Sequence, residues 1–327
     1  MIIIKRKTRP IYKLLLTGGT GFFGKSILSY FYVNNPGIEK ITVLSRHPEK
    51  LNDMFDTKSF PFEIEYVTQD IREPLPYHEP VDYIIHAAAE SSTSVGVENP
   101  ILMRDVIVEG TKNVLECTRR QKVKRLLFVS SGAVYGKQPS NLNHMPEDFK
   151  GAPDPLNSLN SYGCAKRQAE NLCALHNHHY GTDYVVARCF AFVGPHLPLD
   201  AHFAIGNFIR DGLNGGPIVV KGDGTPYRSY LYADNLAEWL WTILMKGKTG
   251  EAYNVGSDEA VTIKELAFKV RESFDNHPEV LIKQKAKPGK APERYVPRVE
   301  KGRKGMGLNE FIPLKESINN TISNLNS

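Results

Sequence analysis

The sequence predicts an α/β fold: a doubly wound parallel sheet with a smaller C-terminal domain. Apolar runs of strand length alternate with helical stretches through the first half of the chain. A glycine-rich turn follows the first run, and beyond Arg188 glycine and proline become frequent and the helical patterns less regular. Nearly continuous apolar strands separated by helices are typical of a parallel sheet that helices cover on both faces.

The expected strands follow one another at 11–16, 40–44, 62–67, 81–86, 126–130 and 184–188. Helices are expected at 25–32, at 100–121 and around Tyr162 and Lys166, and right-handed crossovers through them produce a doubly wound sheet. A strand near 252–256 is expected to return to it. We predict a large domain from 1–188 and 228–258, and a small substrate-binding domain from 189–227 and 259–327. The stretch 283–303 is basic and predicted to be a loop.

The bulk composition restricts the class of protein. Of 327 residues, 41% are hydrophobic and 24% charged, as in soluble globular proteins. The net charge of +5 is mild, and because no basic stripe is interleaved with aromatic residues, we predict no nucleic-acid partner. The four cysteines lack CxxC spacing, so neither a metal site nor a disulfide framework is expected. No segment resembles a signal peptide or a membrane span, which predicts a cytoplasmic protein without a membrane partner.

The glycine-rich turn is Thr17-Gly18-Gly19-Thr20-Gly21-Phe22-Phe23-Gly24, between a predicted strand and a predicted helix. Small residues in this position let the backbone approach a pyrophosphate, whose charge lies at the helix N-terminus. The context is that of a Rossmann dinucleotide site, with GxxGxxG spacing. We predict cofactor contacts from Gly18, Thr20, Gly21, Phe22, Phe23 and Gly24.

The second strand ends in Ser45-Arg46, where an NAD enzyme usually offers an acidic side chain to the ribose 2′-hydroxyl. A guanidinium there can hold a 2′-phosphate, and the serine adds a donor. NADP(H) is therefore favoured over NAD(H); a solvent-facing arginine is the alternative. Further cofactor contacts are expected after the third and fourth strands, from Asp70, Ile71, His86, Ala87 and Ala88.

Tyr162 and Lys166 stand four residues apart and therefore share one helix face. A free phenol has a pKa of about 10, too high to accept a proton at neutral pH, and a nearby cation favours the phenolate. The pair can therefore work as one acid–base unit. Alone, such spacing is common on ordinary helix surfaces; beside the glycine turn it predicts catalysis.

In this combination the chain resembles the extended short-chain dehydrogenase/reductase family of nucleotide-sugar epimerases, dehydratases and ketoreductases. The resemblance rests on Thr17–Gly24, Asp70-Ile71, His86–Ala89, Ser130–Gly136, Tyr162–Lys166, Arg188–Pro195, Gly222–Gly224 with Arg228, and Tyr232–Asp234. It implies that Ser131, Tyr162 and Lys166 form the catalytic set and that the last two also contact the cofactor.

The resemblance further implies a nucleotide-sugar substrate, with Ser131 holding the sugar oxygen and Arg228 against the diphosphate; Arg294 is expected as a second clamp. It also implies a homodimer formed through the helices at 100–121 and 161–180, whose apolar residues could instead cover the sheet. The chain departs from the family pattern at Ile107 and Ala191, each in place of an asparagine.

Three reactions compete within the resemblance. A 4,6-dehydratase needs an additional acid and base beside the serine, where this chain has Gly132-Ala133, so dehydration is disfavoured. Because Ser45-Arg46 indicates NADPH, we favour 4-ketoreduction of a nucleotide-linked 4-keto-6-deoxyhexose, such as dTDP-4-keto-6-deoxyglucose, in deoxysugar biosynthesis. A 4-epimerase is the alternative, and a non-catalytic cofactor sensor a less favoured one.

Overall fold

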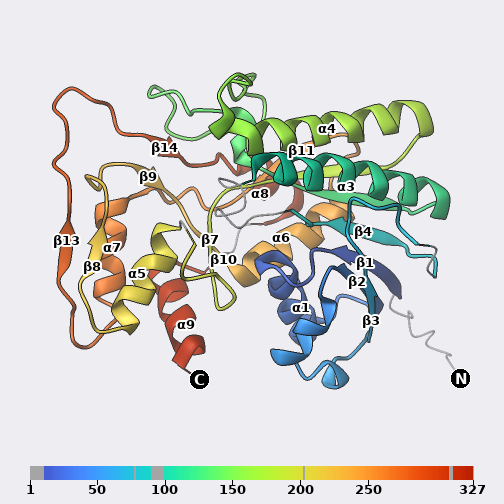
Figure 1. The fold of residues 1–327 in the computed structure, drawn as a ribbon, viewed down its shortest axis with the longest axis horizontal. Coiled ribbons are helices and arrows are strands. Elements are labelled where there is room, and N and C mark those ends of the chain that lie inside the picture. Colours follow the sequence, from blue (N-terminus) through green and yellow to red (C-terminus); the bar gives the residue numbers. More distant parts are fainter. Residues whose placement is uncertain (1–10, 77–78, 90–98, 202, 309–311, 327) are drawn as a thin grey trace, which may run out of the picture.

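The structure is a computed structural model that describes residues 11–76, 79–89, 99–201, 203–308 and 312–326. Its centre is a seven-stranded sheet in the order β11-β6-β5-β4-β1-β2-β3, with all neighbouring strands parallel (Figure 1). The strands are β1 (Tyr12–Thr17), β2 (Ile38–Ser45), β3 (Glu63–Thr68), β4 (Tyr83–His86), β5 (Arg125–Ser131), β6 (Tyr184–Cys189) and β11 (Ala252–Val255). This confirms the predicted doubly wound sheet and the return of the late strand.

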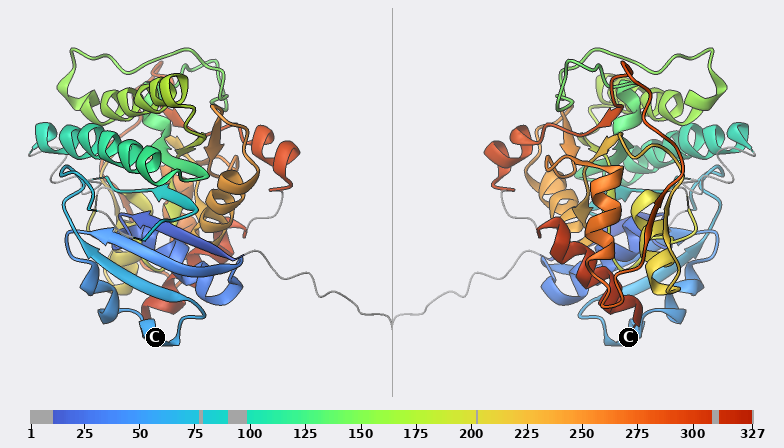
Figure 2. Two further views of the ribbon diagram at one scale, coloured as in Figure 1. Left: turned by 90° about the vertical axis from the view of Figure 1, so that its right-hand side faces the viewer. Right: turned by 90° about the vertical axis from the view of Figure 1, so that its left-hand side faces the viewer.

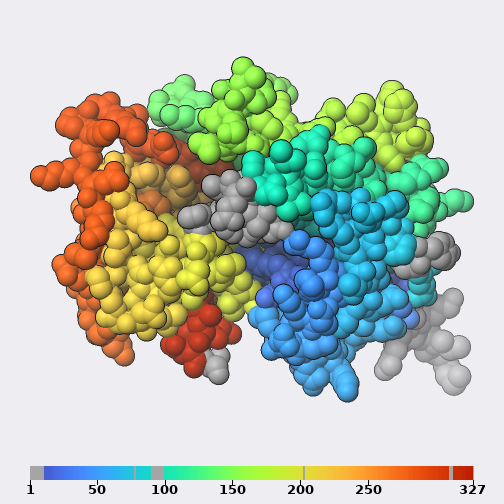
Figure 3. All heavy atoms as spheres, viewed as in Figure 1, coloured from blue at the N-terminus to red at the C-terminus, as the bar shows by residue number. Residues whose placement is uncertain are grey.

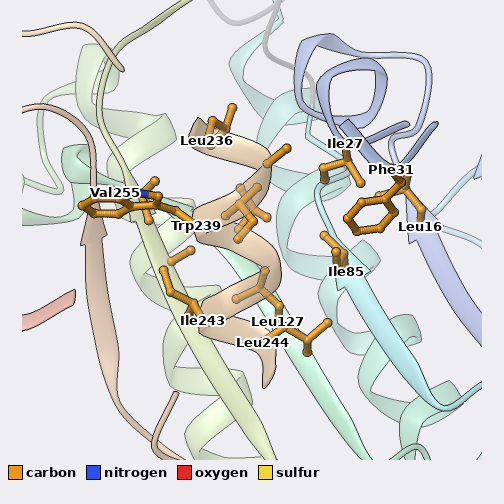
Figure 4. Close-up of a cluster of buried hydrophobic side chains, with 14 of the residues drawn as sticks. Leu16, Ile27, Phe31, Ile85, Leu127, Leu236, Trp239, Ile243, Leu244 and Val255 are labelled. Carbon is orange, nitrogen blue, oxygen red and sulfur yellow. The ribbon is translucent and has the colours of Figure 1, made fainter. Parts of the chain in front are cut away.

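Helices cover both faces of the sheet, as the alternation of buried residues requires. Leu14 and Leu16 of β1 belong to one core, which includes Phe31 of α1 (Phe22–Asn34) and Trp239 of α6 (Ala233–Lys246) (Figure 4). Leu15 belongs to the opposite core, with residues of α3 (Pro100–Gln121) and α4 (Ser161–Tyr180). The two views of Figure 2 agree that α3 and α4 lie together on one side of the sheet.

The ends of the long helices follow local chemistry. The Asn99 side chain accepts the backbone N–H of Leu102 at 3.0 Å and so caps α3, which the sequence predicts over the same residues. Gly181, at φ 69°, ends α4 in the left-handed conformation that glycine adopts without strain. No helix of the described residues is both long and apolar enough to cross a membrane.

A second lobe lies beside the carboxyl ends of the sheet's strands (Figures 1 and 3). Its core joins α5 (Ala204–Leu213), α7 (Ile263–Arg271) and α9 (Leu314–Asn326) to the paired strands β8 (Ile218–Val220) and β13 (Val280–Ile282). A three-stranded sheet orders β12 (Val261–Thr262), β9 (Tyr227–Arg228) and β14 (Arg294–Tyr295). β7 (Phe192–Val193) pairs with β10 (Leu231–Tyr232) between the lobes.

The segment after residue 283 is more ordered than the predicted basic loop. It contains β14 and the start of α8 (Glu300–Met306), and residues such as Val299 and Met306 pack into the core around Trp239. A two-residue strand has no periodicity to detect, and a short helix with internal glycines has little helix propensity. The predicted division into two domains remains a prediction. α8, which falls in the part assigned to the small domain, packs on the large sheet.

Candidate active site

The carboxyl ends of the parallel strands bring the predicted segments to one edge of the sheet. Thr17 of β1 is aligned with His86 of β4, and Ser131 of β5 with Cys189 of β6. The strand order reverses between β1 and β4, because β2 and β3 continue on one side and β5 and β6 on the other. Ligands of open α/β sheets bind at such a switch point.

The glycine turn satisfies the steric demands of a phosphate-binding loop. Gly18 has φ +74°, and a Cβ there would lie 2.8 Å from the Ala88 backbone; a Cβ at Gly24 would overlap the Gly19 backbone. Gly21 caps α1, and among the described residues a Cβ there would meet only the Gly18 carbonyl at 3.5 Å. The described residues therefore leave space in front of the α1 N-terminus, as a pyrophosphate requires.

The two phenylalanines of the turn have another role. Phe22 and Phe23 lie edge to face, and both rings contact Phe192 of β7, with centroids at 6.4 and 5.3 Å. Their side chains thus join α1 to the strand pair between the lobes. Of these two residues, only the backbone amides, at the N-terminus of α1, are placed to bind an anion.

Basic side chains surround the end of β2. Ser45 hydrogen-bonds Thr20 of the glycine turn, Oγ to Oγ1, at 2.9 Å, and Arg46 is exposed. Asp70 accepts two hydrogen bonds from the Arg72 guanidinium, at 2.7 and 3.0 Å. Arg72 foremost, and Arg46 more weakly, lower the pKa of the Asp70 carboxyl. A paired carboxylate repels a phosphate less than a free one, so this corner fits a 2′-phosphate.

His86 is turned into the core. Its Nδ1 lies 2.8 Å from Thr17 Oγ1 and its Nε2 3.2 Å from Thr111 Oγ1, while Thr17 Oγ1 also accepts the N–H of Ala88 at 3.2 Å. Thr111 donates to the Ile107 carbonyl, so it accepts from Nε2–H, and the ring is neutral; burial lowers its pKa to about 3. His86 therefore fixes β1, β4 and α3 and can act on the cofactor only through the backbone.

The other residues predicted to contact the cofactor at this edge of the sheet have apolar side chains, so they can offer it only their backbone groups. Ile71 is buried against Gly110, where a Cβ would lie 2.9 Å from its Cγ2, and its carbonyl accepts the Asn113 amide at 3.0 Å. Ala87 donates its N–H to the Thr17 carbonyl at 3.2 Å. These residues line the strand ends with small or buried side chains.

The three predicted catalytic residues come from β5 and the helix that follows it. Ser131 ends β5, and its Oγ accepts the N–H of Ala133 at 3.2 Å. Tyr162 lies in the first turn of α4, and Lys166 one turn later. Lys166 is 2% exposed, donates to the Val129 carbonyl at 2.7 Å, and lies 4.9 Å from the Phe128 ring centre.

The electrostatics of the pair differ from the expectation. Burial lowers the pKa of Lys166 to about 8 and raises the pKa of the Tyr162 phenol above its usual range. The group that lowers the pKa of Tyr162 is Ser131, by a side-chain hydrogen bond, while the Lys166 amine is directed to the backbone of β5. The serine, rather than the amine, favours the phenolate in this arrangement.

Sequence reasoning missed Tyr295 as a member of this cluster. Its hydroxyl lies 3.4 Å from Ser131 Oγ, and its ring packs on Phe190 with centroids 4.6 Å apart. Nothing near Tyr295 in the sequence signals this role, because the contact joins residues 164 positions apart.

The two predicted phosphate clamps lie on opposite faces of the small sheet. In the parallel pairing of β9 with β14, Tyr295 is opposite Arg228, and Arg294 is opposite Tyr227. Successive side chains of a strand point to opposite faces. Accordingly Arg228 stacks over the Tyr295 ring at 6.0 Å and Arg294 over the Tyr227 ring at 4.0 Å. Only Arg228 shares a face with the catalytic cluster, so the two guanidiniums do not form one clamp.

A partly buried ion pair holds the helix that carries Tyr162 on the sheet. Arg188 of β6 binds both carboxylate oxygens of Glu170 on α4, at 2.7 and 3.0 Å, and Ser130 donates to the same carboxylate at 2.6 Å. Removing one partner of such a pair leaves a costly buried charge. The network therefore fixes α4, and with it Tyr162, relative to β5 and β6.

Comparison with known proteins agrees with this geometry. The family model of the NAD dependent epimerase/dehydratase family matches residues 14–256. UDP-glucuronic acid decarboxylase 3 of Arabidopsis thaliana is 28% identical over 95% of this chain and 88% of its own length. A putative UDP-glucose 4-epimerase of Methanocaldococcus jannaschii is 27% identical over 95% of this chain and 97% of its own length.

Among solved structures, the UDP-glucose 4-epimerase of Thermus thermophilus in complex with NAD superimposes with a TM-score of 0.77. It is 25% identical, and the match covers 96% of this chain and 99% of that one. The match to the family model spans the sheet, the glycine turn and the Ser131–Tyr162–Lys166 set, and the chain belongs to the NAD-dependent epimerase/dehydratase family.

Proposed function

We propose that this protein is an NADP(H)-dependent oxidoreductase of nucleotide sugars, acting as a 4-ketoreductase on a nucleotide-linked 4-keto-6-deoxyhexose such as dTDP-4-keto-6-deoxyglucose. The observation that carries the proposal is the end of β2, where Ser45 and Arg46 stand in place of an acidic residue and the nearby Asp70 is paired with Arg72. NADPH is the usual source of electrons for reduction.

The residues of the chain fit the cofactor at three places. The open N-terminus of α1 at Gly21 suits the pyrophosphate, Arg46 and Ser45 suit the 2′-phosphate, and Lys166 lies at the strand ends where the nicotinamide ribose belongs. The nicotinamide, when bound, supplies the hydride chemistry. The protein supplies orientation, exclusion of water and the proton.

Proton transfer falls to Tyr162. Tyr162 is half-buried, and because desolvation raises the pKa of its phenol, the phenol keeps its proton at neutral pH and can donate it to the C4 oxygen as reduction proceeds. Ser131 hydrogen-bonds the phenol and can hold the same substrate oxygen. Arg228, on the same face of the small sheet as Tyr295, is available to the diphosphate.

Dehydration is disfavoured because Gly132 and Ala133, the residues that follow Ser131, offer no acid. A Cβ at Gly132 would lie 2.7 Å from Cζ of the Phe190 ring and 2.8 Å from the Tyr295 hydroxyl, so the space for a larger side chain is already filled. Ala133 cannot transfer a proton. The remaining polar groups suit a reaction at C4 alone.

The test is turnover of dTDP-4-keto-6-deoxyglucose with purified protein and NADPH or NADH. We expect stoichiometric loss of reduced-nicotinamide absorbance, with NADPH preferred, and Arg46→Ser should reduce that preference by roughly 10- to 100-fold, as expected for a charge-assisted contact of about 1.5–3 kcal/mol. An unchanged preference in Arg46→Ser, or consumption of NADH alone, rejects the cofactor assignment.

A 4-epimerase is the second candidate, favoured by the full-length match to the putative UDP-glucose 4-epimerase. Incubation of UDP-glucose with catalytic NAD(P)+ distinguishes it, because interconversion of hexoses without net cofactor use means epimerisation. UDP-glucuronate belongs in the same panel: release of CO2 from it would instead group the chain with the decarboxylases it resembles.

We also propose that the protein forms a homodimer through α3 and α4. These helices lie side by side, and Ile101 and Leu175 on them are 71% and 47% exposed. Arg119 of α3 also stacks over the Tyr180 ring of α4 at 5.4 Å, which holds the two helices as one surface. Light scattering should give twice the 36.7 kDa mass of the chain for the wild type. A Leu175→Glu variant that is a monomer while the wild type is a dimer would support this face as the interface.

A further inference from the structure

Tyr295 brings a second phenol to the catalytic serine. Its hydroxyl is 3.4 Å from Ser131 Oγ, and the same serine lowers the pKa of the Tyr162 phenol through a side-chain hydrogen bond. The contact is longer than an ordinary O–H···O bond of 2.5–3.0 Å, as catalytic hydrogen bonds often are before substrate tightens them. The structure thus places one serine between two phenols from distant parts of the chain.

The donors and acceptors of this cluster can be assigned one by one. The 3.4 Å contact between the Tyr295 hydroxyl and Ser131 Oγ allows either oxygen to donate. A hydrogen bond from the backbone N–H of Gly132 lowers the pKa of the Tyr295 phenol, and an N–H can only donate, so among the described residues we assign the proton of Tyr295 to Ser131 Oγ. Ser131 Oγ also accepts the Ala133 N–H, so both of its lone pairs are occupied. Its single proton is left for Tyr162 or the substrate oxygen.

We infer that Tyr295 is a positioning residue which fixes the Ser131 hydroxyl as a donor toward Tyr162 and the C4 oxygen. A serine hydroxyl otherwise rotates to suit its neighbours. The inference rests on the proposed proton-transfer role of Tyr162 and adds a third side chain to it.

Two packing contacts fix the position of the Tyr295 ring. One face lies on Phe190, and Arg228 stacks over the ring at 6.0 Å. Gly132 admits the hydroxyl, because a Cβ there would lie 2.8 Å from it. The glycine that occupies the place of a dehydratase acid is therefore the condition for the phenol's approach. Diphosphate binding at Arg228 is also directly beside the ring that orients the serine.

The direct test is Tyr295→Phe, which keeps the ring and its stacking and removes only the hydroxyl. We expect kcat to fall about 2- to 10-fold, the value of one hydrogen bond, with NADP(H) affinity unchanged. Tyr227→Phe is the matched control, since it removes a hydroxyl from the opposite face of the same small sheet and should leave kcat unchanged.

The decisive readout is the ionisation of Tyr162. Among the described residues, the groups that face this phenol are Ser131 from β5, Tyr295 from β14, Cys189 from β6 and, one turn along α4, Lys166. Losing the oriented donor should move the Tyr162 ionisation to higher pH. If Tyr295 acted on Tyr162 only through its charge, which raises the pKa of Tyr162, removing Tyr295 would move the Tyr162 ionisation to lower pH. The sign of the shift therefore separates positioning from simple proximity.

This ionisation is measured without substrate, by fluorine NMR of the NADP+ complex labelled with 3,5-difluorotyrosine, a more acidic phenol. The resonance that Tyr162→Phe removes should titrate at higher pH in Tyr295→Phe and be unmoved in Tyr227→Phe. A shift to lower pH, or none, overturns the inference. Because no nucleotide sugar is used, this result stands apart from the ketoreductase proposal, which fails if no 4-keto sugar is turned over.

Gly132→Ala offers a second route, because its Cβ overlaps both the Tyr295 hydroxyl and the Phe190 ring on which Tyr295 packs, and so displaces the hydroxyl while leaving it on the protein. It should move the Tyr162 titration in the same direction as Tyr295→Phe, and the double variant should add nothing further. Additive shifts in the double variant would show that the two residues act separately, against the inference.

Discussion

The two ends of the candidate site are built in different ways. At the cofactor end, the turn from β1 into α1 is made by residues within eight positions, and its glycines clear one another's backbone. At the catalytic end, Ser131 meets Tyr162 from the next helix and Tyr295 from 164 positions away. Substitutions at the cofactor end should therefore change folding and cofactor binding together. Substitutions at the catalytic end should change turnover in a protein that still folds.

The largest effect should come from Tyr162→Phe. General acid–base catalysis contributes typically 10²- to 10⁴-fold, so we expect turnover to fall by about that factor while NADP(H) affinity and the melting temperature stay close to wild type. Tyr180→Phe, at the exposed end of the same helix, is the control. Turnover within a factor of two of wild type in Tyr162→Phe would move the proton donor elsewhere.

The next effect separates the two faces of the small sheet. Arg228→Met should raise KM for the nucleotide sugar by roughly 10- to 100-fold, since hydrogen bonds to charged groups contribute about 1.5–3 kcal/mol. Arg294→Met should change KM little, because its guanidinium lies on the other face, against Tyr227. Equal increases in the two variants would contradict the assignment of faces.

At the cofactor end, Gly24→Ala should destabilise the protein by about 1–3 kcal/mol, the usual cost of overpacking, and weaken NADP(H) binding as well. Its Cβ would overlap the Gly19 backbone, which cannot rotate away as a side chain can. Gly216→Ala is the control, because nothing lies within 4 Å of its Cβ position. Denaturant unfolding measures the difference, and an equal loss in both variants would remove the steric explanation.

The effect that is smallest near neutral pH, and grows only in acid, is a pH dependence of stability from His86. Burial lowers its pKa to about 3, from about 6.5 in the unfolded chain, so the unfolded state binds the proton more readily. Stability is therefore complete above pH 6.5 and falls as the pH decreases toward 3, by up to about 1.4 kcal/mol per pH unit.

His86→Gln should remove that slope from acid unfolding curves, whatever its effect on stability at neutral pH. His178→Gln, near the end of α4, should leave the slope in place. A slope unchanged in His86→Gln would assign the acid sensitivity to other groups.

The residues recovered from sequence share one property: their role is set by near neighbours. The strands, the helix at 100–121 and the glycine turn follow from periodicity, an asparagine cap and backbone clearance, all of which are local. Residues with partners far along the chain have side-chain roles that the sequence did not reveal. Phe22 and Phe23 contact Phe192, and His86 contacts Thr111, so the cofactor contacts predicted at these positions stay predictions while the packing of the side chains comes from the structure.

The sequence alone determined a doubly wound sheet and the place of its glycine turn, and it predicts a serine–tyrosine–lysine set, because each is encoded in short motifs and in the alternation of apolar runs. Only the tertiary structure decided that Tyr295 reaches Ser131 and that Arg228 and Arg294 face opposite ways. The pairing of β9 with β14 sets both facts, and the register of two short strands is chosen by packing of the whole second lobe, which no local pattern encodes.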